Sequence, residues 1–114
     1  MKTAVRQVAP VSWPSGDGWT IAILATTPEQ FAHSFGLSFE PGIDGLGEYV
    51  LAALCDPAVG QVWLFRHRGA PLAGTEVLVD EAVGRDDGLS ALRRLLGAHL
   101  GRLAWSSPRA SPRG

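Results

Sequence analysis

The sequence predicts an α+β fold in which two helices pack on an antiparallel sheet of three to four strands. Three strand-like apolar runs follow one another in the middle of the chain, and the short connections between them favour antiparallel pairing. A capped helix start precedes these runs, and a leucine stripe at helical spacing follows them. The predicted order of elements is therefore β-α-β-β-β-α-(β), where the last strand is short.

The chain of 114 residues is predicted to form one domain, because it can bury one core but not two. Its ends, residues 1–18 and 106–114, contain Pro, Gly and Ser without sustained periodicity, and we expect them to be loosely ordered. The N-terminus lacks the apolar stretch of a signal peptide, and no run approaches the ~20 apolar residues of a membrane span. These features predict a soluble cytoplasmic protein that does not enter a membrane.

The first strand and the first helix are predicted by two adjoining segments. Residues 19–25 are apolar and partly β-branched, as in a strand that is buried on both faces. Thr27 can cap the helix that follows, Pro28 suits its first turn, and Gln30 can complete a capping box. Gly36 is expected to end this helix.

A Gly-rich segment, residues 40–47, is predicted to be a loop that leads into the three-stranded meander. The strands are expected over residues 48–55, 61–67 and 75–80. In the middle strand, aliphatic and aromatic side chains alternate, which predicts two differently composed faces of the sheet. The meander is the part of the fold on which the functional hypotheses depend.

The second helix is predicted to open at Asp86-Asp87-Gly88 and to run from Asp87, with the aspartates available for capping. Its apolar stripe has helical spacing and comprises Leu89, Leu92, Leu95 and Leu96. Arg93 and Arg94 would face away from the core. Residues 103–105 are apolar enough for a last short strand.

The chain shows no pattern typical of an active site, a metal site or a cofactor site. Cys55 is the only cysteine, so neither an internal disulfide nor a thiolate zinc cluster can form. His33, His67 and His99 are not spaced as metal ligands, and no serine lies in a Gly-x-Ser-x-Gly turn. We therefore expect a protein that is not an enzyme and that carries no catalytic residues, metal or cofactor.

Charge is distributed unevenly along the chain. Six carboxylates lie between residues 7 and 65, a stretch without Lys or Arg: Asp17, Glu29, Glu40, Asp44, Glu48 and Asp56. From residue 88 to the end there are five arginines and no acid. An acidic face can attract a basic protein partner. The arginines are few and scattered and the sequence pI is about 6.3, so direct binding of nucleic acid is not expected.

The segment 61–79, Gln-Val-Trp-Leu-Phe-Arg-His-Arg-Gly-Ala-Pro-Leu-Ala-Gly-Thr-Glu-Val-Leu-Val, reads as a hairpin within a compact, acidic-faced, disulfide-free domain. In general style the chain resembles the small bacterial immunity proteins of contact-dependent growth inhibition systems. The resemblance carries over no functional residue. It implies a non-enzymatic inhibitor that neutralises one cognate protein toxin, such as a nuclease, by covering its active site or substrate path.

The predicted partner-binding residues are carboxylates in and beside the Gly-rich segment, with one at the far end of the next strand: Glu40, Asp44, Glu48 and Asp56. Two alternatives remain open. One is a small enzyme or ligand-binding domain with a pocket near Trp63, Phe65 and His67. The other is a structural or regulatory subunit of a larger assembly. A deep pocket with His67 beside a carboxylate would favour the enzyme, whereas a shallow acidic face would favour the inhibitor.

Overall fold

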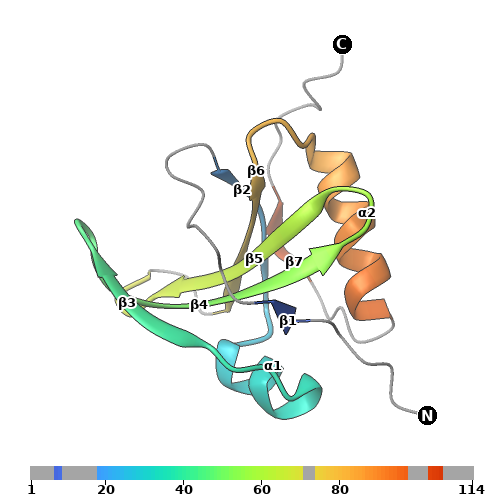
Figure 1. Cartoon of the computed structure of the whole chain (residues 1–114). Coiled ribbons are helices and arrows are strands. Elements are labelled where there is room, and N and C mark those ends of the chain that lie inside the picture. The colour runs from blue at the N-terminus through green and yellow to red at the C-terminus, as the bar shows by residue number, and fades with distance from the viewer. Residues whose placement is uncertain (1–6, 9–17, 71–73, 98–102, 107–114) are drawn as a thin grey trace.

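The computed structural model describes residues 7–8, 18–70, 74–97 and 103–106. In these residues one antiparallel sheet is accompanied by two helices (Figure 1). The elements in chain order are β1 (Gln7–Val8), β2 (Gly18–Leu24), α1 (Pro28–Phe35), β3 (Glu40–Asp44), β4 (Gly47–Asp56), β5 (Gly60–His67), β6 (Thr75–Asp80), α2 (Arg85–Leu96) and β7 (Leu103–Ser106). The predicted α+β class is confirmed. The sheet is larger than expected, with five strands of at least five residues and the short β1 and β7.

The sheet is built around the predicted meander of β4, β5 and β6. The strand order is β1-β4-β5-β6-β2-β7, and β3 also pairs with β4. Every pairing is antiparallel. β4 pairs with β5 along one edge and is long enough to hold two strands along the other, where β3 pairs with its first half and β1 with residues 53–54. The strand that comes early in the sequence, β2, therefore lies beside β6 rather than beside β4.

The start of α1 follows the sequence closely. The Gln30 backbone N–H donates to Thr27 Oγ1 at 3.2 Å, and the Thr27 N–H donates to Gln30 Oε1 at 2.8 Å. Pro28 is the first residue of the helix, and Gly36 ends it at a φ of 68°. The predicted capping box and helix end are both confirmed.

The start of α2 differs from the prediction by two residues. The helix begins at Arg85 after Gly84, and no side chain caps it. Asp86 and Asp87 lie in the first turn, where a carboxylate is stabilised by the helix dipole without acting as a cap. Gly88 allows the close approach of α2 to β2, because a Cβ there would lie 2.6 Å from Ile21 Cδ1.

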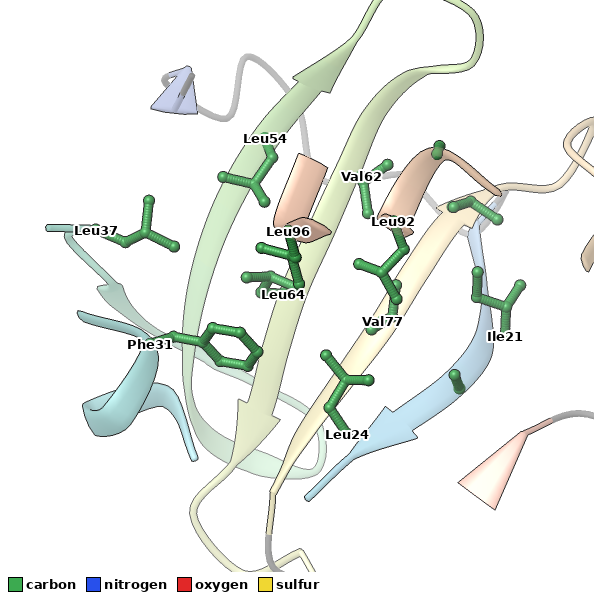
Figure 2. Packing of buried hydrophobic residues seen from close by; sticks show 13 residues of the cluster. Ile21, Leu24, Phe31, Leu37, Leu54, Val62, Leu64, Val77, Leu92 and Leu96 are labelled. Atoms are coloured by element: carbon green, nitrogen blue, oxygen red, sulfur yellow. The ribbon is translucent and has the colours of Figure 1, made fainter. Parts of the chain in front are cut away.

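Both helices cover the same face of the sheet and share its larger core. Phe31 from α1 and Leu92 and Leu96 from α2 are buried with aliphatic residues of the strands (Figure 2). Leu89 and Leu95 are only partly buried at the border of this core. The leucine stripe is therefore confirmed as the packing face of α2, with Leu92 and Leu96 at its centre.

The opposite face of the sheet holds a second, more aromatic cluster. Its buried members are Leu51, Ala53, Trp63, Phe65 and Leu78, and the partly buried Tyr49 packs against them. The predicted alternation of side chains along β5 thus separates two cores. No helix of the described residues covers this face, which we call the helix-free face. Tyr49, at its border, pairs with Gly42 of β3.

The chain ends were expected to be loosely ordered over residues 1–18 and 106–114. Residues 7–8 belong to β1, Gly18 begins β2 and Ser106 ends β7, while the rest of both segments lies outside the described residues. Neither helix in the described ranges has the length and apolar character needed to cross a membrane.

Candidate protein-binding surface

β3 and β4 form a hairpin arm that extends away from α2 (Figure 1). Asp44 pairs with Gly47 across the turn, and the Leu46 N–H donates to Asp44 Oδ1 at 2.8 Å. Gly47 has a φ of 120°, which favours glycine.

The prediction that residues 40–47 form a loop is wrong, since Glu40–Asp44 is a strand. Pro41 is tolerated because, among the described strands, β3 pairs with β4 alone and lies at an edge.

The hairpin is connected to the helix-free face by Tyr49. Its ring lies over Gly42, so that a Cβ at this glycine would overlap the ring. The Tyr49 ring centroid is 5.0 Å from that of Phe65 and 5.9 Å from that of His67. An aromatic ring that covers a strand glycine stabilises both strands of a hairpin. Gly42 and Tyr49 thus fix the position of the arm relative to the body of the sheet.

The substitution Gly42→Val is expected to displace the Tyr49 ring and to lower the free energy of unfolding by about 1–3 kcal/mol, because it overpacks this contact. Near-ultraviolet circular dichroism and urea unfolding measure the two effects. Gly45→Ala is the matched control, since no atom lies within 4 Å of a Cβ at Gly45. Equal spectra and stability for both variants would contradict the role assigned to the Gly42–Tyr49 contact.

The tip of the hairpin exposes two large apolar side chains. Ile43 is 75% exposed and Leu46 is 84% exposed, and these are the exposed large hydrophobics among the described residues. Both lie within residues 40–48, which carry three of the predicted acidic residues. We define the hairpin surface as Glu40, Ile43, Asp44, Leu46 and Glu48.

Two acids of the hairpin surface have side-chain partners that the sequence did not reveal. His67 Nε2 lies 2.9 Å from Asp44 Oδ2, and Arg68 Nη1 lies 3.2 Å from Glu48 Oε2. His67 ends β5 and Arg68 follows it, and the sheet places both residues beside the hairpin. Glu40 is exposed and has no ion-pair partner among the described residues. The acidic stretch is therefore partly neutralised in the fold, although it lacks basic neighbours in the sequence.

Asp44 is held as a carboxylate by its surroundings. The hydrogen bond from the Leu46 backbone N–H, together with the bond to His67, lowers the pKa of Asp44 below its ordinary value. The charged form of this residue thus supports both the turn and the contact with β5.

Asp56 lies apart from the hairpin surface. It is 1% exposed, and its two carboxylate oxygens accept hydrogen bonds from Arg94 Nε and Nη2, both at 3.0 Å. The backbone N–H groups of Ala58 and Val59 donate to the same carboxylate. Asp56 therefore joins the β4–β5 turn to α2, and the Arg94 bonds, followed by the turn N–H groups, lower its pKa. We leave Asp56 out of the proposed binding surface for this reason.

The residues of the alternative pocket meet on the helix-free face. Trp63 and Phe65 are buried, and the rings of Phe65 and His67 are 4.6 Å apart in a T-shaped arrangement. His67 does lie beside a carboxylate, that of Asp44. Two hollows of the described residues are lined by other residues than Trp63, Phe65 and His67.

Of the other two histidines, His33 is exposed on α1 and His99 lies outside the described residues. In the described ranges, no group of three or more His, Cys, Asp or Glu side chains is placed to hold a metal ion. Comparisons of the chain with protein-family models, with curated proteins and with solved structures found no match. The resemblance to immunity proteins therefore stays a prediction.

Proposed function

We propose that the protein is a non-enzymatic binding module whose hairpin surface inhibits a basic protein partner. The observation that carries the proposal is the exposure of Ile43 and Leu46 on a projecting arm among three carboxylates. The partner we propose is a cognate toxin domain, such as a nuclease, whose basic groove for phosphate would be covered by the arm.

Apolar and acidic residues would have different roles in this interaction. Large side chains that fill pockets of a partner usually contribute most of the affinity and slow dissociation. Carboxylates at the rim mainly accelerate association. Because Asp44 is hydrogen-bonded to His67 and Glu48 is paired with Arg68, Ile43 and Leu46 are the expected anchors, and Glu40 is the carboxylate of this surface without an ion pair in the described residues.

The proposal predicts separable kinetic effects of two variants. Ile43→Ser combined with Leu46→Ser should raise the dissociation rate at least tenfold, because two buried apolar anchors contribute about 1.5–3 kcal/mol each. Glu40→Lys, Asp44→Lys and Glu48→Lys together should slow association, most strongly at low salt. Surface plasmon resonance against any toxin domain encoded beside this gene, and survival of cells that express such a toxin, measure both effects.

Glu81→Lys is the control, since Glu81 is exposed in the turn before α2, away from the hairpin. Circular dichroism must show that each variant is folded. Binding and protection that are unchanged in both hairpin variants would overturn the proposed surface. Absence of binding by the wild-type chain would overturn the proposed toxin partner.

A second candidate uses the same apolar tip. Ile43 and Leu46 could bury each other between copies of the chain, as in a subunit of a larger assembly. Sedimentation velocity separates the two candidates. A concentration-dependent dimer that is lost in the double serine variant favours assembly, whereas a monomer at all concentrations favours the inhibitor.

A further inference from the structure

An open hollow of about 440 Å³ lies beside α1, at the end of the sheet that carries the hairpin. It is lined by the first turn of α1, by Pro41 of β3, by residues 48–50 of β4 and by Arg66 and Arg68. Arg66 lies on the same face of β5 as Val62 and Leu64, which pack beneath the helices. Its side chain therefore belongs to the helix side of the sheet.

Among the arginines in the described residues, Arg66 is the one that is partly buried and has no ion pair. Arg68, Arg85 and Arg94 each form an ion pair with an acidic side chain. Arg66 is partly buried and has no acidic partner within 4.0 Å in the described ranges. A guanidinium that has lost part of its hydration without gaining a counterion attracts an anionic ligand.

The other charges around the hollow limit the kind of anion that fits. Glu48 is bonded to Arg68 at 3.2 Å. Glu29 is exposed in the first turn of α1, where the helix dipole favours a carboxylate. A dianionic phosphate would be repelled by these two acids, whereas a single carboxylate can pair with Arg66 through two parallel hydrogen bonds. Pro28, Pro41 and Val50 supply apolar walls beside this charge.

We propose that this hollow binds a carboxylate carried on an apolar body, with Arg66 as its anchor. The carboxylate can belong to a free organic acid or to the C-terminus of a peptide. The hollow shares Glu48 with the hairpin surface, but the proposed anchors of that surface, Ile43 and Leu46, do not line it.

Nuclear magnetic resonance titrations of the full chain test the proposal with benzoate, and benzyl alcohol is its neutral counterpart. A pentapeptide with a C-terminal phenylalanine is titrated in the same way, once with a free C-terminal carboxylate and once with an amidated C-terminus. Benzoate is expected to give saturable shifts near residues 28–30, 48–50 and 66–68. Arg66→Gln should weaken this binding about ten- to a hundredfold, since a charge-assisted hydrogen bond is lost. Tighter binding of the free peptide than of benzoate identifies a chain end as the ligand, and the reverse identifies a small acid.

Arg93→Gln is the matched control, because Arg93 is exposed on α2 and also lacks an ion pair among the described residues. Arg66→Lys keeps the charge but loses the planar fork, so its affinity should be intermediate. The proposal is overturned if benzyl alcohol binds as well as benzoate, or if Arg66→Gln is folded and binds benzoate unchanged. Phosphate binding as tight as that of benzoate would overturn the assigned ligand class.

Discussion

Leu92→Asp is expected to unfold most of the protein at room temperature. Leu92 is fully buried between α2 and the sheet, among residues of both helices and of the central strands (Figure 2). Truncation of such a leucine alone costs about 2–5 kcal/mol, and a buried carboxylate without a partner adds to this cost. The sum is comparable to the whole stability of a small domain, which is about 5–15 kcal/mol.

Circular dichroism and thermal unfolding measure this loss. Arg93→Asp is the control because it introduces the same side chain at the next position, which is exposed. Its expected cost is less than about 1 kcal/mol, mainly from a negative charge near the helix C-terminus. An unchanged melting temperature in Leu92→Asp would show that α2 does not pack on the sheet.

Asp56→Ala is expected to lower the free energy of unfolding by about 2–4 kcal/mol, the second largest effect. The substitution removes both bonds to Arg94 and leaves the N–H groups of Ala58 and Val59 without their acceptor. Asp80→Ala is the matched control. Asp80 accepts a comparable turn bond from the Ala82 N–H but is exposed, so its loss should cost less than about 1 kcal/mol. Similar losses in the two variants would contradict the importance of the Asp56–Arg94 pair.

The same carboxylate makes stability depend on pH. Because the folded-state pKa of Asp56 is lowered, its contribution is fully present above the unfolded value of about 3.9 and is lost as pH falls through the folded value. Urea unfolding of the wild type and of Asp56→Asn from pH 7 to pH 3 should therefore show a stability difference that narrows below about pH 4. A difference that stays constant over this range would contradict the assignment.

The sequence was most informative where local chemistry decides the structure. The capping box of Thr27 and Gln30 and the bounds of β6 were predicted correctly. β3 was missed because Gly and Pro are typical of loops, and only its pairing with β4 makes this segment a strand. The start of α2 was misplaced because Asp86 and Asp87 resemble caps, while the cap position is Gly84.

The sequence predicts only part of the candidate surface, because contacts between residues distant in the chain determine the rest. The charge pattern predicts its carboxylates. Ile43 and Leu46 lie in the same segment, but their exposure was not predicted. The pairs Asp44–His67 and Asp56–Arg94 join residues that are 23 and 38 positions apart. Such partners are set by strand register and helix docking, which residue spacing alone does not specify.

The position of β2 beside β6 has a consequence for the order in which the chain can fold. Gly18 pairs with Asp80, so the apolar run of β2 is synthesised long before its partner strand exists. During translation the meander of β4, β5 and β6 can form from neighbouring segments of the chain. β2 remains unpaired until β6 has been synthesised, and it packs against α2 only after that. The incomplete chain exposes an apolar strand edge in this interval, and at high expression levels this edge is the expected starting point of aggregation.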